Sequence, residues 1–329
     1  MAQTGRRRLQ IAVATSDRIA PFRDRAVRPD SFDLEFADAP AEQIFWRALH
    51  SEDFDLTEMS LAAFCILRSR GDQRFVGLPV FTSRLFRHNS VFVRHDSAIG
   101  SFRELAGRRV GLPEYQMTAA VWVRGLLAEQ YGVDLRSIEW YVGGVEKPGR
   151  KERISLDPPA GYRIHRLDDN QTLAGLLADG AIDAYMSAGI PAALGAAGGV
   201  RRLLADPGAE ERDYFARERI FPIMHMLVLR RRCYDADPGL ARDVYDAFAA
   251  AKDVAARRLY NTETLAVMLP WLNEEYERTR ELMGPDCWPY GVGRNEHCLG
   301  TFLRLLAGQQ LLARPLTVAD LFPSELLDT

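Results

Sequence analysis

Short apolar runs alternate with amphipathic stretches along this chain of 329 residues. Brief apolar runs bounded by turn-forming residues are typical of buried strands, whereas apolar groups at helical spacing indicate helices. The first part of the chain shows both patterns in turn. They predict strands at residues 9–14, 32–36, 53–59 and 74–79, and helices at 41–50 and 61–69. This alternation is typical of an α/β fold.

The same series then starts again. Strands are predicted at residues 108–112, 138–142, 162–166 and 182–187, and helices at 101–106, 117–131 and 171–179. The polar stretch 143–159, rich in Gly and Pro, is predicted to be an excursion or flap. Residues 183–187 resemble residues 55–60, because each stretch begins with an aspartate and ends in a serine. Ser187 is therefore a candidate ligand contact.

One later run, residues 223–229, is apolar except for His225. It predicts a strand buried inside an α/β protein, preceded by Pro222 and followed by three arginines. The run lies where a chain that has built one lobe and then a second would return to the first. A buried imidazole at this point either has a partner that satisfies it in the core or lines a functional site, and both interpretations remain open.

Helices dominate the remainder of the chain. They are predicted at residues 240–259, 263–268, 274–283 and 295–312. Two similar lobes, two crossovers near residues 90 and 222, and a helical C-terminal region match the two-lobed type 2 periplasmic-binding-protein-like (venus flytrap) fold. We expect lobe 1 to comprise residues 1–90 and 222–329, lobe 2 to comprise 91–221, and a ligand to bind in the cleft between them.

Composition narrows the class of protein. The chain is 47% hydrophobic and exceeds the size at which a single core normally stops growing, so two domains are expected. Its 42 basic and 45 acidic residues are dispersed, which predicts no nucleic-acid partner. No segment resembles a signal peptide's apolar region or a membrane span, so we expect a cytoplasmic protein without a membrane partner. The oligomeric state stays open, a homo-oligomer included.

Polar residues follow several predicted strands, at the edge where α/β sheets bind ligands. Glu58 ends the third strand, Arg84 and His88 precede the first crossover, and Tyr115 and Gln116 open the helix at 117–131. For Glu58 and the two basic residues, a solvated surface role is the alternative, because strand ends are commonly polar and arginine is mostly exposed.

Several longer motifs point to one family. They are PEYQMTAAVWVRGLLAEQYGV from Pro113, IFPIMH from Ile220, AFAAAK from Ala247, LPWL from Leu269 and WPYG from Trp288. With them the chain resembles the 4,5-dihydroxyphthalate decarboxylase family over most of its length after about residue 75. The resemblance implies removal of one carboxylate from a catechol-type phthalate, giving protocatechuate and carbon dioxide.

That reaction needs a cation and an acid. An arginine must hold the carboxylate that stays, and Arg84 and Arg124 are the first candidates. Arg124 lies about two turns into its helix, so a structural ion pair is its alternative role. An acid must protonate the ring carbon, for which His225 is the first candidate and His88 the second.

The phenol needs a base or an acceptor, a role that Glu58 or Tyr115 could fill. No cofactor is expected, because a hydroxyl para to the leaving carboxylate can drive its loss. The chain also carries neither a Gly-rich dinucleotide motif nor HExxH, and no metal site is predicted. The partner expected is a small aromatic carboxylate. The alternative function is a non-catalytic solute-binding protein or sensor for an anionic aromatic compound.

Overall fold

The computed structural model describes residues 6–37, 41–51, 53–155 and 159–329, and the chain divides into two compact units. The first comprises Met1–Arg84, Ile223–Gly300 and Leu316–Thr329, and the second Leu85–Pro222 and Thr301–Pro315. Residues 301–315 were expected in lobe 1. They belong to the second unit because their apolar side chains pack there, as shown by Phe302, whose ring centroid lies 5.1 Å from that of Trp122.

A five-stranded sheet forms the centre of the first unit. Its strands are β1 (Arg7–Ala12), β2 (Phe32–Phe36), β3 (Leu56–Ser60), β4 (Phe75–Arg84) and β11 (Ile223–Arg230), in the order β2-β1-β3-β11-β4. β1 runs parallel to β2 and β3, whereas β11 is antiparallel to both of its neighbours. The apolar run around His225 is thus an interior strand, as predicted, and its position between two strands explains why it is almost entirely apolar.

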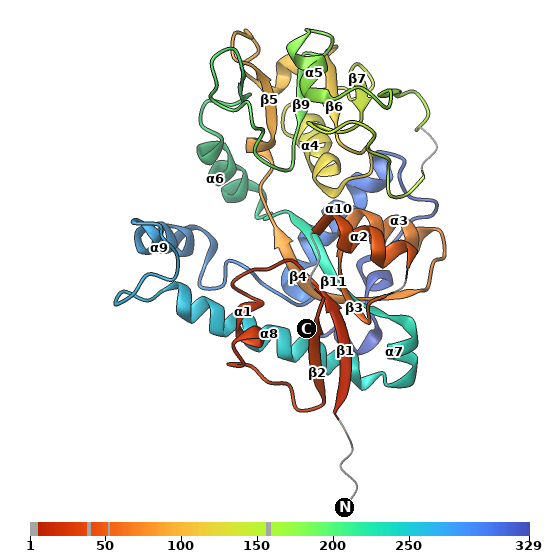
Figure 1. Cartoon of the computed structure of the whole chain (residues 1–329), viewed down its shortest axis with the longest axis vertical. Coiled ribbons are helices and arrows are strands. Elements are labelled where there is room, and N and C mark those ends of the chain that lie inside the picture. Colours follow the sequence, from red (N-terminus) through yellow and green to blue (C-terminus); the bar gives the residue numbers. More distant parts are fainter. Residues whose placement is uncertain (1–5, 38–40, 52, 156–158) are drawn as a thin grey trace, which may run out of the picture. The chain divides into compact units, whose positions relative to one another are not determined.

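The helices of the first unit surround this sheet. They are α1 (Ala20–Arg23), α2 (Ala41–His50), α3 (Leu61–Ser69), α7 (Arg231–Ala236), α8 (Gly239–Leu259), α9 (Leu272–Met283) and the first turn of α10 (Glu296–Gly308). The long helix α8, drawn in cyan in Figure 1, contacts both α1 and β4. Among the described residues, no helix is long and apolar enough to cross a membrane.

The helix predicted at residues 263–268 is absent from the structure, in which this stretch is irregular and bends. The apolar residues of this stretch have no core to pack against, since Leu265, Val267 and Met268 are all exposed. Tertiary packing supplies most of the stability of short helices in proteins. Apolar residues at helical spacing therefore do not form a helix here, because they are not buried.

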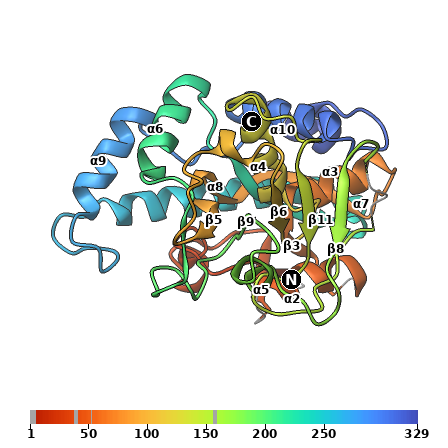
Figure 2. The ribbon, with the colours of Figure 1, turned by 90° about the horizontal axis from the view of Figure 1, so that it is seen from above.

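A six-stranded sheet forms the centre of the second unit. Its strands are β5 (Val91–Arg94), β6 (Arg109–Leu112), β7 (Glu139–Val142), β8 (Arg163–Arg166), β9 (Ala184–Met186) and β10 (Val200–Arg202), in the order β10-β5-β9-β6-β7-β8. Figure 2 shows β5, β9, β6 and β8 following one another across this unit. Its helices are α4 (Thr118–Glu129), α5 (Leu173–Ala178), α6 (Pro207–Glu218) and the remainder of α10.

Helix α6 was not predicted from the sequence. Its composition is mostly polar, and within it only Tyr214 and Phe215 are buried, so the apolar spacing is weak. Its start nevertheless carries two recognisable signals. The Asp206 side chain accepts a hydrogen bond from the Ala209 N–H at 3.0 Å, and Pro207 occupies the first helical position.

Candidate functional site

The carboxyl ends of β1, β3 and β4 lie at one edge of the first sheet, where the antiparallel strand β11 begins. The pairing of His225 with Ser60 on one side and Ser83 on the other places the imidazole at this edge. Ser60 also caps α3, because its hydroxyl accepts a hydrogen bond from the Ala63 N–H at 3.3 Å. Open α/β sheets bind their ligands at such edges.

Two of the predicted catalytic residues meet here. Glu58 is paired with Leu227 in the sheet and His225 with Ser60, and alternate residues of a strand share a face. The two side chains therefore lie on the same face, and Nδ1 of His225 is 2.5 Å from Oε1 of Glu58. The second carboxylate oxygen, Oε2, accepts a hydrogen bond from the Ala14 N–H at 2.9 Å.

The charge state of Glu58 follows from these contacts. Burial would raise the pKa of Glu58, but its hydrogen bonds with His225 and the Ala14 N–H, together with the charge of His225, hold the pKa below the usual value. The ionised carboxylate can only accept, so Nδ1 of His225 carries the hydrogen that joins them. Because Nδ1 is engaged with Glu58, proton exchange between the imidazole and a bound molecule would occur at Nε2. The His225 side chain keeps 27% of its surface exposed, against 4% for Glu58.

Arg18 lies at the same edge and was not singled out from the sequence. Its guanidinium stacks on the Trp288 ring, 4.0 Å from the centroid, and its Nη2 donates to the Thr82 carbonyl at 3.0 Å. The Trp288 indole N–H donates to the neighbouring Phe81 carbonyl at 2.8 Å. The end of β4 therefore holds both members of the stacked pair. The signal in the sequence is the polar turn 15–18, which lies shortly after β1 at the edge where α/β sheets bind their ligands.

Arg18 keeps hydrogen-bonding capacity in this position. Nη1 donates to the exposed Asp17 carboxylate at 2.7 Å, whereas the buried Nε–H has no hydrogen-bond partner among the described residues. A buried guanidinium N–H without an acceptor is unfavourable, and a carboxylate would supply one.

Arg84 is buried behind this edge. Its Nη2 donates to the Pro289 carbonyl at 2.9 Å and to the Asn295 side-chain oxygen. Burial lowers the pKa of Arg84 to about 10, so the side chain stays charged at neutral pH. These contacts join the end of β4 to the loop that carries Trp288, and a direct contact of Arg84 with a ligand remains a prediction.

His88 belongs to the second unit and is packed among aromatic rings. Its ring centroid lies 5.2 Å from that of Tyr214 and 6.4 Å from that of Phe102. Burial, reinforced by the nearby charge of Arg217, lowers the pKa of His88 to about 4. At neutral pH the imidazole is uncharged and therefore a poor acid, which favours His225 over His88 for that role.

Two other predicted residues form a buried group in the second unit. The Arg124 guanidinium stacks 3.8 Å from the centroid of the Tyr115 ring and donates to the Tyr115 carbonyl at 2.7 Å. Its Nε donates to the side-chain oxygen of Gln309 at 2.8 Å. Burial raises the pKa of Tyr115, although the charge of Arg124 opposes the shift, so the phenol stays protonated at neutral pH.

Gln116 follows β6 and Ser187 follows β9, and these two strands are parallel neighbours in the second sheet. The Gln116 side-chain amide donates to the Ile154 carbonyl at 3.1 Å, and the Ser187 hydroxyl donates to the Gly189 carbonyl at 2.8 Å. Their roles as ligand contacts remain predictions. In the part of the chain that the structure describes, no three His, Cys, Asp or Glu side chains come together as a group that could hold a metal ion.

Two solved structures of sulfonate-binding proteins share the fold of this chain. The periplasmic aliphatic sulphonate binding protein SsuA from Escherichia coli matches 99% of this chain with all of its own, at a TM-score of 0.54 and 14% identity. The alkanesulfonate-binding protein SsuA from Xanthomonas axonopodis pv. citri, bound to MOPS, matches 98% with 99% of its own, at a TM-score of 0.52 and 16% identity. The chain has the two-lobed type 2 periplasmic-binding-protein-like fold.

Sequence comparison identifies the protein family to which the chain belongs. No model of a known protein family matches the chain. The 4,5-dihydroxyphthalate decarboxylase of Comamonas testosteroni is 39% identical over 315 residues, covering 95% of this chain and 96% of the relative. The enzyme of the same name from Pseudomonas putida is 40% identical over 183 residues, covering 56% and 71% respectively. The chain belongs to the 4,5-dihydroxyphthalate decarboxylase family and is an enzyme of the carboxy-lyase class.

Proposed function

We propose that this enzyme removes one carboxylate from a hydroxylated aromatic dicarboxylate without the help of a cofactor, with 4,5-dihydroxyphthalate as the substrate. The products would be protocatechuate and carbon dioxide. The observation that carries the proposal within the chain is the contact between Glu58 and His225, 2.5 Å apart at the ligand-binding edge of the first sheet. The names of the two similar decarboxylases support the choice of substrate.

In the proposed reaction, His225 is the acid. Its Nε2–H delivers a proton to the ring carbon that bears the departing carboxylate, and the hydroxyl para to that carbon supplies electron density. The bond between the ring and the carboxylate then breaks, its electron pair restores the aromatic ring, and carbon dioxide leaves. Proton transfer by a positioned side chain contributes roughly 10²- to 10⁴-fold to a rate.

Glu58 is a positioning residue in this scheme. Both of its oxygens already accept hydrogen bonds, one from His225 and one from the Ala14 N–H. Glu58 is therefore less suited to act as the base or acceptor for the substrate phenol, the role that the sequence suggests for it. Its carboxylate instead fixes the imidazole ring, through the hydrogen bond with Nδ1, in the orientation that directs Nε2 outward.

Arg18 is the proposed anchor for the carboxylate that stays on the ring. Its guanidinium is held by Trp288 and the Thr82 carbonyl and has a buried N–H without an acceptor among the described residues. Arg84 would act behind it by fixing the loop that carries Trp288.

The test follows both products of the reaction. Purified protein is incubated with 4,5-dihydroxyphthalate while carbon dioxide release and protocatechuate are quantified together. His225→Ala is expected to lower kcat by at least about a hundredfold. His95→Ala is the matched control, because His95 is an exposed histidine outside the proposed site, and it should leave kcat unchanged.

Three results would contradict the proposal. Saturable binding of the substrate without turnover would favour the alternative of a solute-binding protein. Unchanged turnover in His225→Ala would remove the imidazole as the acid. Loss of activity on treatment with a chelator, restored by a divalent metal, would argue against a reaction without a cofactor.

A further inference from the structure

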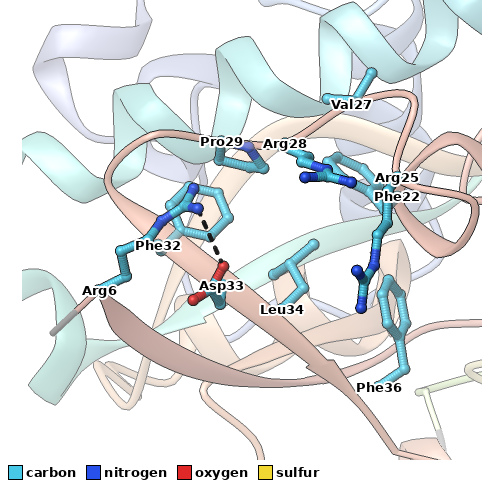
Figure 3. Close-up of a pocket in the computed structure, with 10 residues that line it drawn as sticks. All are labelled: Arg6, Phe22, Arg25, Val27, Arg28, Pro29, Phe32, Asp33, Leu34 and Phe36. Carbon is cyan, nitrogen blue, oxygen red and sulfur yellow. Dashed lines mark ion pairs between the residues drawn. The ribbon is translucent and has the colours of Figure 1, made fainter.

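A pocket lies in the first unit, on the outer side of the edge strand β2 (Figure 3). Its volume is about 420 Å³, which lies within the range of small-molecule sites. Part of its lining is apolar and part is cationic. The residues that matter for its chemistry are Phe32, Leu34, Phe36, Arg6, Arg25 and Arg28.

The apolar floor arises from the position of β2. Its side chains alternate, so that Phe32, Leu34 and Phe36 share one face, and β2 has a neighbour, β1, on one side only. Phe32 is fully buried, but Leu34 and Phe36 remain partly exposed because the segment 21–29 covers them incompletely. This leaves apolar surface available to a ligand.

The rim of the pocket is positively charged. Arg25 and Arg28 are exposed, and neither forms an ion pair with any residue that the structure describes. Arg6 contacts the single acidic residue of the lining, Asp33, at 3.5 Å between Nη1 and Oδ1. Arg25 also adopts a left-handed backbone conformation, with φ of 63°, in the turn that follows α1. Three guanidinium groups and one carboxylate therefore surround the floor.

We propose that this pocket binds an aromatic carboxylate, at a site separate from the one that contains Glu58 and His225. An aromatic ring would cover Leu34 and Phe36, while its carboxylate would accept hydrogen bonds from Arg25 and Arg28. The two sites have no residue in common, and β1 separates β2 from the strand that carries Glu58. The inference concerns binding alone and is independent of the proposed reaction.

The experiment uses 3-fluorobenzoate as the probe, because it has one carboxylate and lacks the hydroxyl that the proposed reaction needs. Binding to the full chain is measured by fluorine NMR and by calorimetry. The variant Arg25→Ser/Arg28→Ser is expected to weaken binding at this pocket at least tenfold. Arg257→Ser, an exposed arginine of the same unit without an ion pair among the described residues, is the matched control and should bind like the parent protein.

Further measurements separate the pocket from the proposed active site. Arg18→Ser should leave the pocket occupied, and Arg25→Ser/Arg28→Ser should turn over 4,5-dihydroxyphthalate at the parent rate when no probe is added. Raising the salt concentration should weaken probe binding, because the guanidinium groups are exposed.

Three outcomes would overturn the inference. One is unchanged probe binding in Arg25→Ser/Arg28→Ser. Another is equally tight binding of benzyl alcohol, which has the ring without the charge. The last is binding of a hexaglutamate peptide together with no binding of the probe, which would assign the surface to an acidic protein segment. A failure of turnover alone would contradict the proposed function and leave this inference standing.

Discussion

Replacing Glu58 by glutamine tests the contact on which the proposed reaction depends. The change preserves the size of the side chain and an oxygen that can accept the Ala14 N–H, but it removes the charge facing His225. A hydrogen bond to a charged group contributes about 1.5–3 kcal/mol. At about 1.36 kcal/mol for each tenfold change in rate, Glu58→Gln should lower kcat roughly ten- to a hundredfold.

The assay is a double-mutant cycle. We expect kcat to fall in Glu58→Gln and, more strongly, in His225→Ala, and the double variant to match His225→Ala. This non-additivity is expected because Glu58 would act through the imidazole. KM should change little, since both Glu58 oxygens are occupied by the protein. If Glu58→Gln lowers kcat by the same factor with and without His225, Glu58 acts on the substrate directly and the assignment is wrong.

The same variant has an expected effect on stability. The pKa of Glu58 is lower in the folded protein than in the unfolded chain, so its carboxylate stabilises the fold at neutral pH. This contribution is lost as the pH falls below the usual glutamate pKa of about 4.3. Urea unfolding should therefore show Glu58→Gln as less stable at pH 7, with the difference from the parent shrinking toward pH 3. A difference that grew on acidification would contradict this sign.

Two further predictions concern packing and a buried ion cluster. In Gly77→Ala the new Cβ would lie 2.3 Å from the Leu321 backbone oxygen, so we expect a loss of about 1–3 kcal/mol in stability, seen as a lower urea midpoint. Gly100→Ala is the control and should be neutral, because its Cβ would make only an ordinary contact with the Glu104 carboxylate at 3.9 Å. The buried Glu114 carboxylate accepts from Arg150 and Arg153, so Glu114→Gln should lower stability by about 1–3 kcal/mol and speed hydrogen exchange at residues 149–154. The more exposed pair between Glu139 and Arg163 is the control, and Glu139→Gln should change stability by at most about 1 kcal/mol.

The fold was largely predictable because it depends on local patterns. Apolar runs bounded by turns marked most of the strands of both sheets, although not β5 and β10, and the return of the chain at residue 223 placed an interior strand correctly. The predictions were wrong or incomplete where local pattern and burial disagree. Residues 263–268 have helical spacing without a core beside them, and α6 is a polar helix with little spacing to detect.

For the site, the residue types at strand ends could be read from the chain, but their partners could not. Glu58 and His225 are separated by 167 positions, and only the antiparallel register of β3 and β11 brings them within 2.5 Å. Arg18 and Trp288 are similarly joined through the end of β4. His88 and His225 look alike as sequence candidates, yet burial keeps one uncharged while the other faces a carboxylate.

The amino-acid sequence alone thus specified the α/β class, most of the strands, and the family resemblance, because these depend on periodicity and on contiguous motifs. The pairing of the imidazole with Glu58, the arginine that stacks at the sheet edge, and the cationic pocket beside β2 came from the folded structure. The physical reason is that charge state and hydrogen bonding depend on neighbours that are distant in the chain, and strand register and burial select those neighbours.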